Sequence, residues 1–198
     1  MDAATSASEE AGASGADARA RLTTLVAITV ALLATFLGVC HVKDDNIVQA
    51  MQQAQADKLD HWNFYQARNI REEVATSTLA QLRLSAAGAP PARQAEYAAA
   101  VTKYEQLAAD QAQKKDALRV QAEQDQKTYD ALNYRDDQFD LADALVALAI
   151  SLLAMTALTH KRWLYFVALV PTLGGLLMGL AGLLAWHIHP DSLSGLLS

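Results

Sequence analysis

Two apolar segments, residues 22–42 and 139–158, flank a long polar segment whose only glycine and prolines fall near its midpoint. The break is Gly88-Ala89-Pro90-Pro91, and it divides the polar segment into two arms of nearly equal length. If helical throughout, each arm is about 67 to 69 Å long at roughly 1.5 Å per residue. A chain that leaves a membrane along one arm therefore returns to it along the other. The lengths predict an antiparallel helical hairpin over residues 43–138, with its turn at 88–91.

The overall apolar fraction of 52% is an average that would suit a soluble protein. The apolar residues are in fact concentrated in three blocks, and these blocks indicate the class of protein. Residues 22–42 carry no charge, and about 20 apolar residues suffice to cross a bilayer core. The stretch before this block lacks a signal peptide's pattern and no cleavage site follows it, which favours an uncleaved anchor. Residues 139–158 and 163–188 also reach spanning length. The sequence predicts an all-α membrane protein: three transmembrane helices, with a coiled-coil hairpin between the first and second.

Positive charge near the spans predicts the orientation. The second and third spans are joined by Thr159-His160-Lys161-Arg162, and short loops rich in Lys and Arg stay in the cytoplasm. The N-terminus, with Arg19 and Arg21, then lies on the same side. The hairpin and the tail 189–198 are predicted on the opposite, periplasmic side. Residues 1–21 contain little apolar surface, which predicts a disordered tail.

The second arm contains a heptad seam with polar interruptions. Gln111, Lys115 and Asp125 fall on seam positions. The simpler interpretation is that they reach solvent past a loose seam, and the alternative is that they set the register against a partner. The seam residues themselves are Tyr97, Val101, Tyr104, Ala108, Leu118, Ala122, Tyr129, Leu132 and Phe139.

The first arm is less regular and places aromatic residues on more than one face. Trp62, Phe64 and Tyr65 cannot all face the second arm, because a helical hairpin buries one seam per arm. They form the candidate interaction surface for another protein or another copy of the chain. The alternative is irregular packing within the hairpin.

Acidic and imidazole side chains gather near one membrane boundary. Asp140 and Asp143 share a helix face, and His41, His187 and His189 are predicted at the same depth. Such a group could bind an ion or a metal or relay protons, although His187 and His189 point to different faces of a helix. The alternative is ordinary interfacial polarity, since acids are stabilised at a helix N-terminus. No cofactor is predicted.

The third span contains Gly175, Gly179 and Gly182. Gly175 and Gly179 form a Gly-x-x-x-Gly pair, a spacing that lets helix backbones approach closely. The glycines serve either packing within the chain or assembly of several copies. Pro171 is expected to kink this helix.

Several functional classes are disfavoured. The formal charge of −6 leaves no basic surface for nucleic acid. The sequence has no phosphate-binding glycine loop, no G-x-S-x-G and no H-E-x-x-H. We therefore expect neither nucleic-acid binding nor enzymatic activity.

The run from Leu22 to Glu73 joins the first span to the segments KDDNIVQAM and WNFYQAR. In this combination it resembles an uncharacterised family of small bacterial inner-membrane proteins, described as a domain of unknown function. The resemblance extends more loosely over the second arm and the last two spans. It implies three spans with a coiled-coil insert in a Gram-negative bacterium, and it transfers no activity or site residue.

Together these features predict a multi-pass protein of the bacterial inner membrane, in contact with lipid, that acts as a structural scaffold. Its hairpin would bind a protein partner or other copies, forming a homo-oligomer. The alternative is a homo-oligomeric ion channel or transporter with Asp140, Asp143 and the histidines at its outer mouth. Envelope sensing through the N-terminal tail is a third hypothesis, although that tail contains no output domain.

Overall fold

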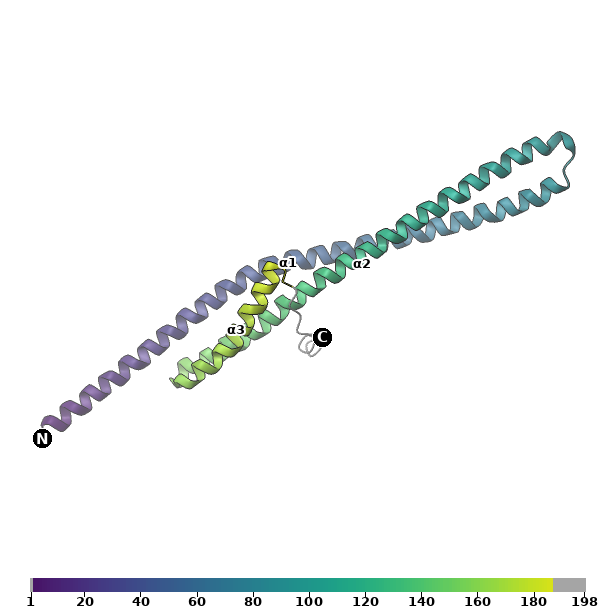
Figure 1. The fold of residues 1–198 in the computed structure, drawn as a ribbon. Coiled ribbons are helices and arrows are strands. Elements are labelled where there is room, and N and C mark those ends of the chain that lie inside the picture. The colour runs from purple at the N-terminus through teal and green to yellow at the C-terminus, as the bar shows by residue number, and fades with distance from the viewer. Residues whose placement is uncertain (1, 187–198) are drawn as a thin grey trace. The chain divides into compact units, whose positions relative to one another are not determined.

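The computed structural model describes the backbone of residues 2–186 and the side chains of residues 17–186. The described chain is helical except at two short connections and at its C-terminal end, and it contains no strand. Its elements are α1 (Asp2–Ala87), the 3-10 turn η1 (Pro91–Arg93), α2 (Gln94–Thr159) and α3 (Arg162–Leu184) (Figure 1).

Helix α1 begins at Asp2, whereas the sequence predicts a disordered tail over residues 1–21. Alanine, the strongest helix former, is the commonest residue of this stretch. The stretch also adjoins the first apolar span, and extending an existing helix avoids the cost of nucleation. The prediction considered only the lack of apolar surface and omitted this continuity.

The Gly/Pro cluster separates α1 from α2. Helix α1 ends at Ala87, and Gly88 begins the turn. Pro90 and Pro91 remove two successive backbone donors, and the ring of each clashes with the preceding turn, so the pair strongly disfavours a continuous α-helix. Elsewhere α1 and α2 contain no proline, and each is a single unbroken helix.

The chain divides into two compact units. The three-helix unit contains Met1–Gln49 and Leu132–Ser198, and the two-helix unit contains Ala50–Ala131.

The core of the three-helix unit is apolar and draws on all three helices. Two buried polar residues, Thr156 and Thr172, donate their hydroxyl protons to the carbonyls of Leu152 and Ala168, each at 2.8 Å. Their burial therefore leaves no hydroxyl donor unpaired. The buried core residues are Val26 and Leu33 of α1, Val146, Ala149 and Leu153 of α2, and Ala168 of α3.

All three helices are long and apolar enough to cross a membrane. The most apolar stretches of α1, α2 and α3 are only 17%, 33% and 44% buried inside the chain. Large side chains such as Leu32, Leu158 and Phe166 remain exposed on them. This surface is stable in contact with lipid, which supports a multi-pass membrane protein.

The three glycines of α3 lie against other helices of the same chain. A Cβ atom on Gly175 would lie 2.7 Å from Val146 Cγ2, and one on Gly179 would lie 2.6 Å from the Phe36 ring. A Cβ atom on Gly182 would meet the Phe139 ring at 2.8 Å. Of the two roles that the sequence allows, the structure shows packing within the chain at all three positions.

Helix α3 is shorter than the predicted span 163–188. It passes through Pro171 as one helix and ends at Leu184. Ala185 adopts a left-handed φ of 55°, and the N–H of Trp186 donates to the Ala181 carbonyl at 2.9 Å. This hydrogen bond closes the helix end.

Helices α1 and α2 run antiparallel within the two-helix unit, as shown by side-chain pairs from His61–Asp125 to Arg83–Glu105, each 2.6 Å long.

The three residues that interrupt the predicted heptad seam all have partners on α1, so they do not simply reach solvent. The pairs are Arg68–Gln111 at 3.0 Å, Glu72–Lys115 at 2.6 Å and His61–Asp125.

Candidate functional site

The structure brings together two of the five residues predicted as an ion or metal site. His41 Nε2 lies 3.2 Å from Asp143 Oδ1, and the two side chains are 56% and 52% exposed. Asp140 is also exposed, one turn before Asp143 on α2. His187 and His189 lie outside the described residues.

This pair does not extend to a metal site within the described part of the chain. Among those residues, no three His, Cys, Asp or Glu side chains gather closely enough to hold a metal ion. Exposed ion pairs contribute little to stability, because water already solvates both groups. His41 and Asp143 are therefore a surface polar pair, outside the apolar core.

A second acidic pair lies at the same end of the three-helix unit. The carboxyl groups of Asp44 and Asp136 face each other closely enough to interact by charge, and by a hydrogen bond when one of them is protonated. Burial, followed by the charge of Asp136, raises the pKa of Asp44 to about 6. Burial also raises the pKa of Asp136, opposed by the hydrogen bond from Asp44. The pair therefore holds a proton at a pH where isolated carboxyl groups have lost theirs.

Arg135 and Gln138 attach α2 to the C-terminal end of α3. Arg135 Nη2 donates to the Gly182 carbonyl and Gln138 Nε2 to the Trp186 carbonyl, both at 2.8 Å. Carbonyls at a helix end have no partner within the helix, so these donors satisfy them. Neither residue was predicted from the sequence to contact another helix. Arg135 could have been noticed, because it is the only cation in an acidic stretch of α2.

Replacing Asp44 with asparagine is expected to remove a pH-dependent loss of stability. Because the pKa of Asp44 is higher in the folded protein, the wild-type free energy of unfolding falls as pH rises from about 4 to about 6. Asparagine stays neutral, so the variant should be more stable than wild type near pH 7.5 by about 1 kcal/mol, after allowance for solvent screening. Denaturation in mild detergent across this pH range measures the difference.

Asp116→Asn is the matched control for this experiment, because Asp116 is an exposed carboxylate of α2 in the two-helix unit. Its pH profile should follow that of the wild type. An Asp44→Asn profile that also follows the wild type would contradict the protonated pair.

The predicted aromatic surface is only partly exposed. Trp62 and Tyr65 are half-buried and pack edge to face, with ring centroids 5.2 Å apart. Phe64 is 59% exposed. Two of the three aromatics thus contribute to packing within the two-helix unit, which leaves Phe64 at the surface.

A different set of exposed apolar residues shares one face of α1, with polar residues between them. Leu59, Ile70, Val74 and Leu84 are between 57% and 78% exposed. At 3.6 residues per turn, the four lie within about 80° of one another around the helix. We call this set the apolar stripe. It lies on the opposite side of α1 from buried Leu79, and the interaction surface predicted from the sequence included none of its four residues.

The comparisons with known proteins place the chain in a family but assign no chemistry to it. No curated protein and no solved structure matches the chain. One family model, the Domain of unknown function (DUF4337), matches residues 22–185, which include the three candidate spans and the whole two-helix unit. The chain belongs to the DUF4337 family.

Proposed function

We propose that this protein is a membrane-anchored scaffold whose two-helix unit is a coiled-coil hairpin that associates with other copies of the chain. The apolar stripe carries the proposal. It consists of four large aliphatic side chains on the face of α1 that α2 does not cover. Exposed apolar surface of this kind is unfavourable in water and is typical of helix–helix interfaces.

The polar pairs of the two-helix unit support a structural role. Arg68–Gln111, Glu72–Lys115 and His61–Asp125 link α1 and α2 in one register, which keeps the stripe on the outer face. Polar residues at seam positions commonly select register and alignment at some cost in stability. A hairpin with a fixed register presents a defined surface, as a scaffold requires.

The location of this scaffold follows from the charge pattern. We propose the bacterial inner membrane, with the N-terminus and the Lys161-Arg162 loop in the cytoplasm and the hairpin in the periplasm. Its role in this proposal is non-catalytic.

Cysteine cross-linking in native membranes tests self-association. Ile70→Cys places a thiol in the apolar stripe, and Gln113→Cys places one at an exposed polar position of α2 as the matched control. We expect several times more disulfide-linked dimer from Ile70→Cys, since the stripe brings two copies together. Cys40 is buried, so the wild-type chain serves as a blank. Equal yields from the two variants would contradict the proposal.

Native mass spectrometry of the protein released from its own membrane provides an independent test. A homo-oligomer that becomes monomeric in an Ile70→Glu, Val74→Glu variant is the expected result. A complex with a different protein at fixed stoichiometry would instead assign the stripe to that partner and overturn self-association.

The channel alternative requires a path between copies of the chain, lined by the second and third spans with Asp143 at its mouth. The exposed pair of His41 and Asp143 is compatible with either function, whereas the apolar stripe favours the scaffold.

A further inference from the structure

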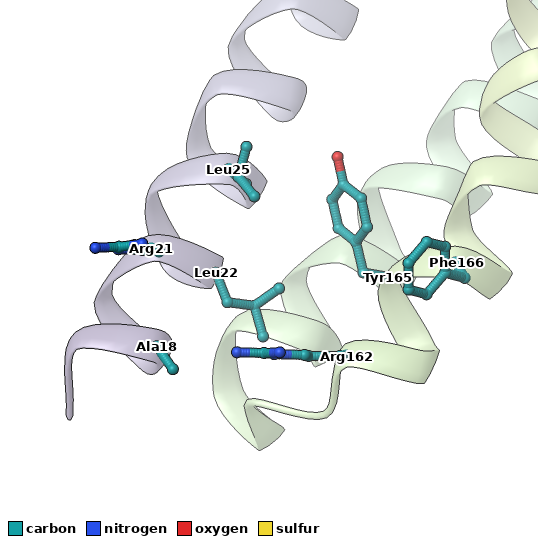
Figure 2. A pocket seen from close by; sticks show the side chains of 7 residues that line it. All are labelled: Ala18, Arg21, Leu22, Leu25, Arg162, Tyr165 and Phe166. Carbon is teal, nitrogen blue, oxygen red and sulfur yellow. The ribbon is translucent and has the colours of Figure 1, made fainter. Parts of the chain in front are cut away.

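A cavity of about 260 Å³ lies between α1 and α3 in the three-helix unit. Its walls are mainly apolar and include Leu22, Leu25 and Phe166, and two arginines, Arg21 and Arg162, are among its lining residues (Figure 2). The combination of an apolar groove with cations at one end fits an amphiphile with a negatively charged head group.

The two arginines have no charge partner among the residues whose side chains the structure describes. Neither guanidinium forms a hydrogen bond or an ion pair with any described side chain. Arg162 extends toward α1 beneath Leu22, while Arg21 leaves α1 on the side away from α3 (Figure 2). The Arg21 side chain is exposed and unpaired, so rotation about its side-chain bonds can bring it to the mouth. A guanidinium group binds phosphate through two parallel hydrogen bonds.

The groove lies at the depth where a phospholipid changes from head group to acyl chain. Leu22 begins the uncharged run of α1, and Arg162 is the first residue of α3. The arginines are therefore at the ends of two candidate spans, level with lipid phosphates, and the apolar wall continues toward the bilayer centre. The Tyr165 hydroxyl lies 3.1 Å from Thr29 Oγ1, so this hydroxyl is engaged within the protein.

The beginning of α3 favours an anion at the same place. The Lys161 side chain makes no capping hydrogen bond to the first turn of this 23-residue helix. The positive end of the helix dipole then adds to the charge of Arg162. The Arg162 guanidinium, an uncapped helix start and an apolar groove thus meet within one site, and the Arg21 side chain must rotate to join them.

We propose that this groove binds one anionic phospholipid, with its phosphate held by Arg162 and Arg21 and one acyl chain along Leu22, Leu25 and Phe166. A zwitterionic lipid would bring its own cation to the arginines and bind more weakly. A free phosphate ion would leave the apolar wall uncovered. The bound lipid would bridge α1 and α3, and this site is independent of the proposed scaffold function.

Native mass spectrometry of the full-length protein in mild detergent tests this site. The probes are phosphatidylglycerol and, as the zwitterionic comparison, phosphatidylcholine. We expect the Arg21→Gln, Arg162→Gln double variant to bind phosphatidylglycerol about tenfold more weakly than the wild type. Binding of phosphatidylcholine should be weak in both proteins.

Arg19→Gln, Lys161→Gln is the matched control. It removes the same charge from the same end of the spans, but neither residue lines the groove. Because a micelle of nonionic detergent has no anionic surface potential, this control should bind phosphatidylglycerol within about twofold of the wild type. Equal losses in the two double variants would show unspecific attraction to charge and overturn the proposal.

A variant that changes no charge tests the apolar half of the site. Ala18→Phe fills the groove, and it should also weaken binding of phosphatidylglycerol. Unchanged binding in Ala18→Phe, or equal binding of phosphatidylcholine by the wild type, would overturn the proposal. Displacement of the lipid by an equal concentration of inorganic phosphate would identify a simple anion site instead. Circular dichroism establishes that each variant is folded.

Discussion

Gly175→Leu should lower the free energy of unfolding of the three-helix unit by about 3 kcal/mol, the largest effect expected of any single substitution considered for this chain. A Cβ atom at Gly175 would lie 2.7 Å from Val146 Cγ2 and 3.2 Å from both the Ala142 carbonyl oxygen and the Val146 nitrogen. Two of these three atoms belong to the backbone, so no side-chain rotation can move them out of the way. Leucine must therefore push α3 away from α2 and open the core. Unfolding by SDS titration in mild detergent measures the loss.

Gly38→Leu is the matched control, since it makes the same substitution in another spanning segment. A Cβ atom at Gly38 meets no atom within 4 Å. Its leucine should leave stability unchanged or raise it by up to about 1 kcal/mol through helix propensity. Equal losses of stability in the two variants would show that the cost comes from the larger side chain itself and not from its contacts with α2. A change of oligomer mass without loss of monomer stability would assign Gly175 to assembly instead.

Gln138→Leu is expected to cost about 2 kcal/mol, the second largest effect. Gln138 is 1% exposed, and its amide donates to the Trp186 carbonyl at the C-terminal end of α3. Leucine occupies a similar volume, so the substitution leaves no large cavity, but it cannot donate a hydrogen bond. The Trp186 carbonyl loses this donor, which is the main source of the loss. The same SDS titration measures it, with intrinsic tryptophan fluorescence as the readout.

Gln113→Leu provides the comparison for that experiment. Gln113 is an exposed residue of the same helix, and surface substitutions of this kind change stability by less than about 0.5 kcal/mol. If Gln138→Leu were as mild as Gln113→Leu, the hydrogen bond to α3 would contribute nothing measurable to stability.

The candidate sites show where sequence reasoning stops. The composition and spacing around Asp140 and Asp143 identified an acidic membrane boundary, but they could not identify which acid meets which partner. The structure pairs Asp143 with His41 from α1, and it pairs Asp44 with Asp136. These pairings depend on the rotation of two helices about their axes, which a one-dimensional pattern does not contain.

The interaction surface predicted from the sequence shows the same limit of a one-dimensional pattern. Aromatic residues on several faces of the first arm indicated a surface available to a partner, yet Trp62 and Tyr65 pack on each other. The exposed face instead consists of aliphatic residues such as Ile70 and Leu84. Amphipathic patterning identifies apolar positions, whereas only the position of the second helix decides which of them remain uncovered.

The sequence by itself determined the helical elements of this protein and their approximate limits, apart from the start of α1, because these depend on local chemistry. Uncharged runs of spanning length, strong helix formers throughout both arms, and prolines that cannot donate a hydrogen bond act within a few residues of where they occur. Only the tertiary structure decided the surroundings of Gly175, Gln138 and Arg162. A close approach, a buried hydrogen bond and a place in a groove between two helices are each defined by atoms from a distant part of the chain.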